Sequence, residues 1–279
     1  MVDVVVRAHN DMDLIEETLR GIRQQTLECR ILVMDNESTD GTTDVARTIA
    51  DQVINIPAGT YIPGAVLNRA MKATSSDRVV FLNSDCTPVD QLWLETLLAG
   101  FDQDDVAAVF SQQLPRPDCR PLFCKDTRDT FGDGSQQAGW RHCFSMASSA
   151  IQRSVWEEMD FNEAIQYSED IEWTWRARQR GYTIRYCPES KVYHSHNYTL
   201  KQWFRRQYGE GKADAQIFDW SAWESSWLRY SGMPFMRQIL SDWKFGLKTR
   251  SLEAIVHSPP LRLMQLLGRR KGFNDGITR

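Results

Sequence analysis

The sequence predicts an α/β protein with a mostly parallel central sheet. Short apolar runs alternate with amphipathic runs over the first third of the chain, and polar residues stand where the apolar runs end. Alternating strands and helices form βαβ units, because parallel neighbours need a crossover between them. Of the 279 residues, 42% are hydrophobic and 25% are charged, which suits a globular protein with a full-sized core.

The first half of the chain gives the clearest elements. The run VDVVVRA at 2–8 predicts a buried strand, and 11–26 predicts a helix with its apolar residues on one face. Asp13 and Glu16 have the spacing of a helix cap and its third-position partner. We expect further strands at 29–35, 51–57, 77–85 and 106–112, and further helices at 38–50, 64–74 and 88–101.

The second half is less regular. From Pro115 to Gly139 there is little periodicity, which predicts a long loop of the kind that is usually functional or mobile. We divide the chain into an α/β domain, residues 1–199, and a helical extension, residues 200–279. Within the first domain we expect a strand at 142–151, helices at 153–159 and 167–181, and extended segments at 182–186 and 191–196.

Two carboxylates, Glu169 and Asp170, stand at the start of the helix that Gly181 ends. Acidic side chains in a first turn complement the helix dipole, and this structural role needs no function. The alternative is that one carboxylate is a general base. This stretch alone favours the structural role.

Ligands of open α/β sheets bind beyond the carboxyl ends of the strands, which selects RAHND, DNESTDGT and NSDCTP. None has a glycine-rich phosphate loop, which argues against dinucleotide-binding and P-loop proteins. Asn83 and Asp85 would share one side of an extended chain and could hold Mg2+ or Mn2+ with a diphosphate. The same residues are also strong turn formers.

Two further features indicate a site at this edge. His194 and His196 end an apolar run and would face one side of an extended segment, as ligands of a metal held mainly by Asp85. An ordinary polar contact is the alternative. Asp35 ends another strand, where it could accept a hydrogen bond from a nucleobase.

Cysteine usage and charge limit the class of protein. The six cysteines include no C-x-x-C pair, so we expect reduced thiols. No apolar run approaches a membrane span and the start lacks the apolar core of a secretory signal, which predicts a cytoplasmic protein. The net charge of -4 is uneven, with +7 from Leu200 onward and -11 before it.

In their order, VVVRAHND, VMDNESTDGT, FLNSDCTP and YSEDIEWTWRARQRGY resemble the motifs of family 2 glycosyltransferases of the GT-A fold. The resemblance covers roughly the first two hundred residues. TYIPGAVLNRA, SQQLPRPD and KVYHSHNYTLKQWFRRQYGEG resemble the bacterial rhamnosyltransferase branch. The sequence departs from the family where NSD replaces D-x-D and where RAHN replaces Pro-Thr-Tyr-Asn.

The resemblance implies a role for each matching residue. Asp170 would be the catalytic base, and Glu169 would support it or position the acceptor. Asp85 would bind Mn2+ or Mg2+ with His194 or His196. The other implied contacts are with the nucleotide (Arg7, His9, Asp35, Asn68, Asn83 and Ser84) and with the acceptor (Trp140 and Trp173).

The implied reaction is an inverting transfer from dTDP-L-rhamnose or a UDP-sugar to a hydroxyl of a glycan or lipid-linked acceptor, with no nucleic-acid partner. A carboxylate takes the proton of the attacking hydroxyl, and a metal neutralises the departing diphosphate. Two alternatives stay open. The incomplete D-x-D favours a degenerate module that only binds nucleotide or glycan, whereas a sugar nucleotidyltransferase would need a glycine-rich loop that RAHNDMD lacks.

The extension beyond Leu200 holds half of the ten tryptophans. Helices that cover the sheet edge or pair two subunits in a homodimer explain it most simply. The alternative is peripheral contact with a membrane, where a basic and aromatic face meets anionic headgroups. The segment PPLRLMQLLGRRKG fits either role.

Overall fold

The computed structural model describes residues 1–136 and 142–277. The chain divides into two compact units, which we call unit 1 and unit 2. The longest segment of unit 2 begins at Ser195, and unit 2 also takes in two short segments that the sequence did not predict. Unit 1 comprises residues 1–116, 128–165 and 169–194, and unit 2 comprises residues 117–127, 166–168 and 195–279.

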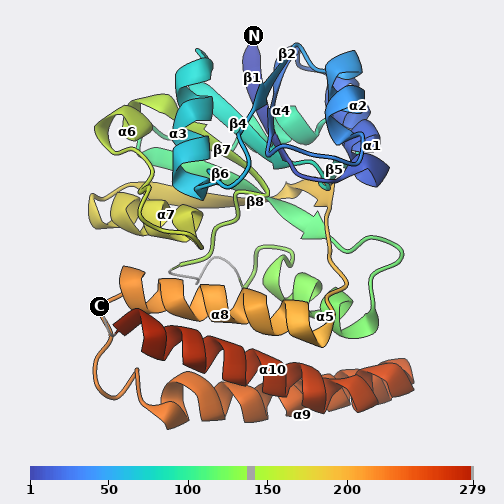
Figure 1. The fold of residues 1–279 in the computed structure, drawn as a ribbon, viewed down its shortest axis with the longest axis vertical. Helices are drawn as coiled ribbons and strands as arrows, with labels where there is room; N and C mark the ends of the chain where they lie inside the picture. The colour runs from blue at the N-terminus through green and yellow to red at the C-terminus, as the bar shows by residue number, and fades with distance from the viewer. Residues whose placement is uncertain (137–141, 278–279) are drawn as a thin grey trace. The chain divides into compact units, whose positions relative to one another are not determined.

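Unit 1 is built on a mixed sheet whose eight described strands have the order β3-β2-β1-β4-β7-β6-β8-β5 (Figure 1). All strands from β1 to β4, with β6 and β8, run in one direction, whereas β7 is antiparallel to both β4 and β6. The carboxyl ends of the parallel strands therefore meet at one edge. The strands are β1 (Val2–Ala8), β2 (Cys29–Asp35), β3 (Gln52–Asn55), β4 (Arg78–Asn83), β5 (Thr87–Pro88), β6 (Val106–Leu114), β7 (Ser148–Gln152) and β8 (Thr183–Tyr193).

Helices cover both faces of this sheet, and each face has its own core. Val4 and Val6 of β1 contribute to one core and Val5 to the other, as the alternation of side chains along a strand requires. On the first face lie α1 (Met12–Arg23), α2 (Thr42–Ile49) and α4 (Trp93–Leu98), and on the second lie α3 (Pro63–Ala73), α6 (Arg153–Glu158) and α7 (Glu169–Gln179).

Several local predictions were wrong. The strand expected at 142–151 begins only at Ser148, as β7. The N-cap of α1 is Asp11, so Asp13 lies inside the first turn and forms no capping box. The expected loop at 115–139 contains a helix, α5 (Pro121–Thr130). The two extended segments expected at 182–186 and 191–196 form one strand, β8, which pairs along β6 with a register shift between Ser111 and Gln112.

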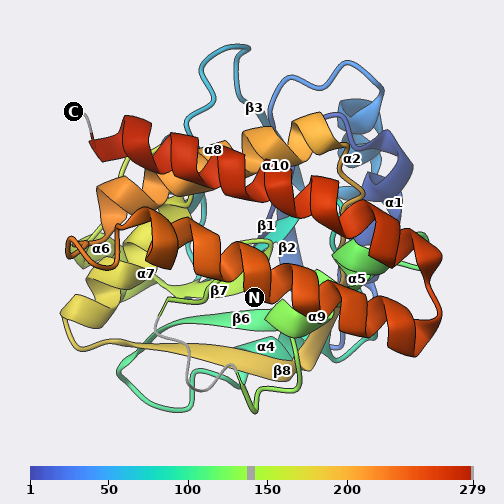
Figure 2. The same ribbon diagram turned by 90° about the horizontal axis from the view of Figure 1, so that it is seen from below.

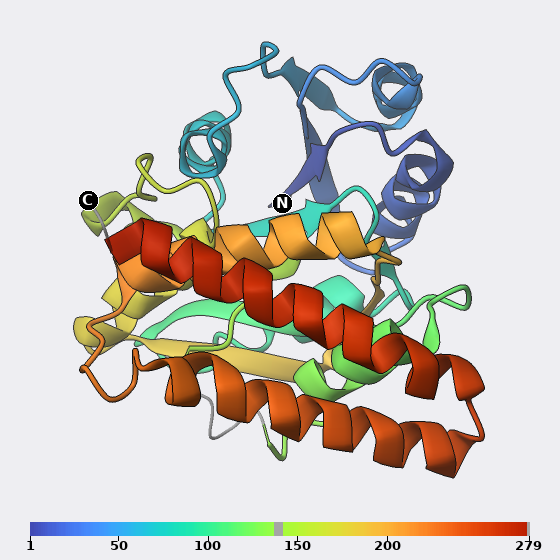
Figure 3. The same ribbon diagram turned by 60° about the horizontal axis from the view of Figure 1, so that its bottom comes forward.

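Unit 2 contains α8 (Leu200–Ile217), a π-helical turn (Leu228–Gly232), α9 (Met233–Thr249) and α10 (Leu252–Ile277). Figures 2 and 3 show α10 lying beside both α8 and α9, in agreement with their contacts. Helix α8 starts with a complete capping box between Thr199 and Gln202. None of the helices in the described part of the chain is both long and apolar enough to cross a bilayer.

A buried ion pair joins the helices of unit 2. Asp242 of α9 and Arg262 of α10 are almost fully buried, and the Arg262 Nε lies 2.7 Å from the Asp242 Oδ2. The Ser258 hydroxyl donates to the same carboxylate at 2.7 Å. Arg262 also donates to Asp126, which lies in the 117–127 segment of unit 2. Because buried charges are stable only when paired and hydrogen-bonded, this network fixes how these segments pack.

Candidate active site

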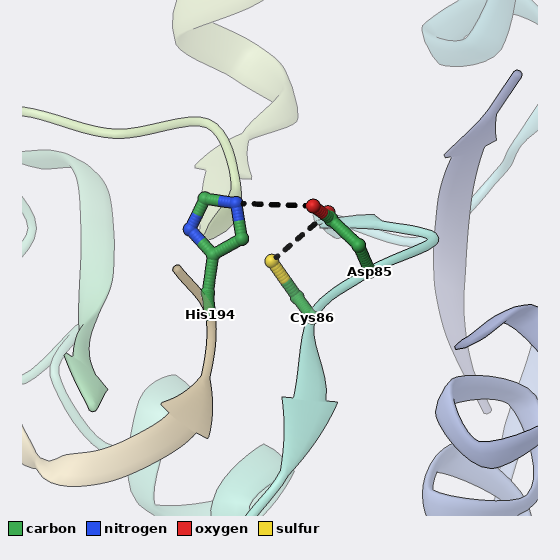
Figure 4. Close-up of side chains that lie close together, drawn as sticks. All are labelled: Asp85, Cys86 and His194. Carbon is green, nitrogen blue, oxygen red and sulfur yellow. Dashed lines mark hydrogen bonds and ion pairs between the residues drawn. The ribbon is translucent and has the colours of Figure 1, made fainter. Parts of the chain in front are cut away.

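Three potential metal-binding side chains converge at the carboxyl edge of the sheet in unit 1. Asp85 lies in the turn after β4, and His194 directly follows β8. The Nε2 of His194 is 3.5 Å from the Oδ2 of Asp85. The donor atoms of these two residues and of Cys86 lie within 4.8 Å of one another (Figure 4). The structure thus places His194 beside Asp85, the pairing that the sequence predicted.

The chemistry of this group suits a hard or borderline divalent cation. A carboxylate and an imidazole are ligands that Mn2+ accepts. The Cys86 thiol is fully buried, and burial, followed by the nearby Asp85 charge, raises its pKa well above the ordinary value. The thiol is therefore neutral here, and the ligand set is dominated by oxygen and nitrogen.

Two residues of the SQQLPRPD motif, whose roles the sequence did not predict, contact the candidate metal ligands. The amide oxygen of Gln113 accepts a hydrogen bond from the Nδ1 of His194 at 2.6 Å, and its amide nitrogen donates to Ser145 at 2.8 Å. Because an amide oxygen only accepts, Nδ1 carries a proton, and Nε2 is the ring nitrogen that faces Asp85. Arg116 donates to the backbone oxygen of Asp85 at 2.9 Å and fixes the turn.

Arg7 connects the end of β4, next to the turn that carries Asp85, to α7. Its Nη2 donates to the Oδ1 of Asn83 at 2.8 Å, and its Nη1 lies 3.2 Å from the Oε1 of Glu169. Among the described atoms its Nε has no hydrogen-bond partner. The guanidinium, expected from the resemblance to lie near base and ribose, is therefore mainly a bridge between β4 and α7.

The two carboxylates at the start of α7 have different environments. Glu169 is buried, and burial together with the adjacent Asp170 charge raises its pKa to about 7, against the opposing effect of Arg7. Asp170 is half-buried and accepts hydrogen bonds from the backbone N–H of Met146 at 3.0 Å and of Ile171 at 2.8 Å. Glu169 is thus bound to Arg7, whereas Asp170 is the carboxylate with solvent access.

The predicted nucleobase contacts lie at the ends of the first two strands. The carboxylate of Asp35 is 1% exposed and accepts hydrogen bonds from Ser38 N–H, the Ser38 hydroxyl and the Thr43 hydroxyl. It therefore shapes the turn between β2 and α2. His9 is exposed, and its Nδ1 lies 2.7 Å from the backbone oxygen of Asn36.

Asn68 does not face a ligand site. Its amide oxygen accepts from the Trp156 indole and from the Phe161 N–H, each at 2.9 Å. Its amide nitrogen donates to the Phe161 oxygen and to Glu163, again at 2.9 Å. All four hydrogen-bonding positions are used and the residue is 2% exposed, so Asn68 secures the packing of α3 instead of binding nucleotide.

Ser84 also departs from its expected role as a nucleotide contact. It is 1% exposed, and its hydroxyl donates to the Asp11 carboxylate. Ser84 lies in the turn that follows β4, because that strand ends at Asn83. The same contact turns the Asp11 carboxylate away from the N-terminus of α1, which has no side-chain cap.

The acceptor residues and the second histidine are revised. Trp173 is fully buried and its indole donates to the Met159 oxygen at 2.6 Å, so it belongs to the core and cannot be an acceptor platform. His196 lies outside the metal-binding group, and its ring packs 5.1 Å from that of Tyr198. The alternation that was expected to align it with His194 fails because β8 ends at Tyr193. Trp140 lies outside the described residues.

Comparison with known proteins identifies the family. The family model described as Glycosyl transferase family 2 matches residues 3–160, more than half of the chain. The chain belongs to glycosyltransferase family 2. The matched region of this glycosyltransferase includes Arg7, Asp35, Asn83 and Asp85, and the predicted membership is confirmed.

Relatives support the rhamnosyltransferase-like branch. The glycosyltransferase is 34% identical over 207 residues to the O-antigen chain rhamnosyltransferase WbaN of Salmonella anatum, a match that covers 70% of this chain and 66% of that protein. It is 29% identical over 223 residues to the O-antigen chain rhamnosyltransferase RfbN of Salmonella typhimurium, covering 75% of this chain and 71% of the relative.

Solved structures confirm the GT-A fold. The mannosyltransferase PcManGT of Pyrobaculum calidifontis superposes with a TM-score of 0.61 at 17% identity, over 99% of this chain and 73% of that one. The glucosyl-3-phosphoglycerate synthase of Mycobacterium tuberculosis superposes with a TM-score of 0.55 at 20% identity, over 74% of this chain and 75% of that one. At these identities the likeness concerns the fold.

Proposed function

We propose that this glycosyltransferase transfers L-rhamnose from a nucleoside-diphosphate donor to a hydroxyl of a bacterial surface glycan or its lipid-linked precursor, with inversion at the anomeric carbon. The two relatives named as O-antigen chain rhamnosyltransferases support the sugar and the acceptor class. dTDP-L-rhamnose is the favoured donor, and UDP-sugars come next.

Asp85 and His194 are the residues that would hold a divalent cation, Mn2+ or Mg2+. Two structural neighbours support this. The mannosyltransferase was solved with GDP-Man and Mn2+, and the glucosyl-3-phosphoglycerate synthase was solved with Mn2+, UDP-glucose and phosphoglyceric acid. When bound, such an ion supplies positive charge next to a diphosphate leaving group. Gln113 keeps the imidazole oriented for this role through its hydrogen bond to Nδ1.

Asp170 is the proposed general base. The attacking hydroxyl forms a bond to the anomeric carbon while the bond from that carbon to the diphosphate oxygen breaks, and the hydroxyl proton passes to the Asp170 carboxylate. Two backbone N–H groups hold this carboxylate in place, and it keeps solvent access. Because the reaction is a single displacement, it inverts the anomeric configuration.

The observation that carries the proposal is the link between the two halves of the site. Asp85 and His194 meet at the carboxyl edge of the sheet, and Arg7 joins the adjacent Asn83 to Glu169, the neighbour of Asp170. The guanidinium of Arg7 thus connects the edge proposed to bind the donor with the start of α7, where Glu169 and Asp170 lie. A structural role of the carboxylates at a helix N-terminus does not require this bridge.

The first test combines ligand binding with turnover. Melting temperature is measured with dTDP, UDP, GDP and CMP, each with and without Mn2+, because a ligand that binds only the folded state raises it. We expect a metal-dependent rise with dTDP and release of dTDP from dTDP-L-rhamnose in the presence of a glycan acceptor. A folded sample that responds to no nucleotide would instead support a degenerate module without donor binding.

A further inference from the structure

Helix α9 of unit 2 carries an apolar stripe that is exposed in the described part of the chain. Five large side chains recur at intervals of three and four residues, which places them on one side of the helix. Ile239, Asp242 and Gly246 occupy the buried side. The exposed residues and their exposed fractions are Met233 (46%), Met236 (57%), Leu240 (60%), Trp243 (42%) and Leu247 (72%).

The basic side chains of α9 are exposed, whereas its acidic side chain is buried. Arg237, Lys244 and Lys248 are exposed and lie at intervals of seven and four residues, so they form a basic row next to the apolar stripe. The single acidic residue of α9, Asp242, is fully buried against Arg262. Every exposed charge on α9 is therefore positive.

Large apolar residues also precede the helix. Trp223 is 62% exposed, Trp227 is 58% exposed and Leu228 is 51% exposed. Tryptophan is favoured where an apolar environment meets water, since its ring is apolar and its N–H needs a polar partner. Exposed apolar residues scattered singly need no explanation, but five along one side of one helix indicate a binding surface.

We propose that the exposed face of α9 docks on an anionic lipid membrane, with the helix lying in the plane of the headgroups. An apolar stripe with a tryptophan, bordered by lysine and arginine, is the pattern of helices that bind at membrane interfaces. The basic row complements anionic headgroups, each residue adding to the attraction. This inference concerns a surface of unit 2 and does not depend on the identity of the transferred sugar.

The charge pattern disfavours a second copy of the chain as the occupant. In a symmetric dimer the same patch of both subunits meets, so residues of the patch face residues of the same patch. Arg237, Lys244 and Lys248 would then border the interface from both sides, and α9 offers no exposed carboxylate to compensate them. The negative charges of an anionic lipid surface would instead attract these three basic side chains directly.

The sequence indicated a possible membrane contact in the segment that forms α10, whereas the structure favours α9 for this role. The segment PPLRLMQLLGRRKG lies in α10, where Leu261 and Arg262 are buried. Leu263 and Leu267 of the same segment are exposed, but they lack the continuous apolar stripe and the basic row that α9 carries.

The test is co-sedimentation of the full chain with vesicles. We expect binding to vesicles of phosphatidylglycerol and phosphatidylcholine to exceed binding to pure phosphatidylcholine by about tenfold, and to weaken at high salt because the headgroup attraction is screened. The double variant Leu240→Gln/Leu247→Gln should bind the anionic vesicles about tenfold more weakly than the parent, because the apolar stripe is interrupted. Both residues are exposed, so its melting temperature should match the parent.

Two further variants make the test specific. Leu92→Gln is the matched control, because Leu92 is 53% exposed but lies in unit 1, and it should bind vesicles like the parent. Lys244→Glu/Lys248→Glu should weaken binding to the anionic vesicles about tenfold.

Three results would overturn the proposal: no binding of the parent to anionic vesicles, equal binding by the Leu240/Leu247 variant, or light scattering that shows a dimer which this variant dissociates. The last result would assign the face to a second copy of the chain.

Discussion

At the scale of single residues, Glu169 shows burial outweighing a neighbouring positive charge. Its pKa is raised to about 7, first by burial and then by Asp170, although Arg7 lies 3.2 Å away. A carboxyl with a raised pKa in the folded state adds stability that is complete below its unfolded value and is lost as pH rises through about 7. Between pH 4.5 and about 7, where this contribution is lost, the free energy of unfolding should fall less steeply with pH in Glu169→Gln than in the parent.

The effect of Asp170 on Glu169 can be measured directly. Asp170→Asn removes a like charge next to Glu169, which favours the ionised form and lowers the pKa of Glu169. Carbon-13 NMR of labelled glutamate carboxyls, followed against pH, reads this value. A Glu169 pKa that stays the same or rises in the variant would show that the two carboxylates do not interact as the geometry indicates.

Gln113 is expected to control metal affinity without touching the metal. Gln113→Leu removes the acceptor that fixes the proton of His194 on Nδ1, and the loss of such a contact typically weakens metal binding 10- to 100-fold, so we expect about that effect. Calorimetric titration of Mn2+ in the presence of dTDP measures it. Gln112→Leu is the control, since Gln112 donates to the backbone oxygens of Phe131 and Gly132 and should leave Mn2+ affinity unchanged.

At the scale of elements, glycines decide how closely α10 approaches α8. Gly268, Gly272 and Gly276 recur every four residues on one side of α10, and a Cβ on Gly272 would lie 2.0 Å from the Tyr208 oxygen of α8. Since neither backbone can yield cheaply, Gly272→Ala should lower the free energy of unfolding by about 1–3 kcal/mol, as overpacking does. Urea unfolding tests this against Gln216→Ala, an exposed position of α8 where we expect a change within about 0.5 kcal/mol. Equal effects of the two substitutions would contradict the close approach.

The sequence predicted most elements because hydrophobic periodicity is a local signal. The strands β1 to β4 and the start of α7 at Glu169 follow from it, and the carboxyl-edge rule then selected Asp85 and Asp35. Long-range contacts carry no such signal. The partners of Asn68 lie about ninety residues further along the chain, and the cap of α1 is lost because the Asp11 carboxylate turns to Ser84.

At the scale of the whole molecule, the family and the fold could be predicted from the order of the motifs. The residues that orient Asp85 and His194 could not. Gln113 and Arg116 lie in the SQQLPRPD motif, but their contacts follow from where β6 ends beside β8 and the Asp85 turn. The division of the chain also combines distant segments, since 117–127 and 166–168 join unit 2. Such assignments depend on packing that sequence spacing does not encode.

The most direct test of sugar transfer by this molecule is the Asp170→Asn variant, compared with Asp44→Asn, an exposed aspartate outside the site. Turnover of dTDP-L-rhamnose and affinity for dTDP with Mn2+ are measured on the same samples. We predict that turnover falls roughly 10²- to 10⁴-fold in Asp170→Asn, the usual contribution of a general base, with dTDP affinity unchanged and Asp44→Asn like the parent. Parental turnover in Asp170→Asn would contradict the assignment of Asp170 as the base.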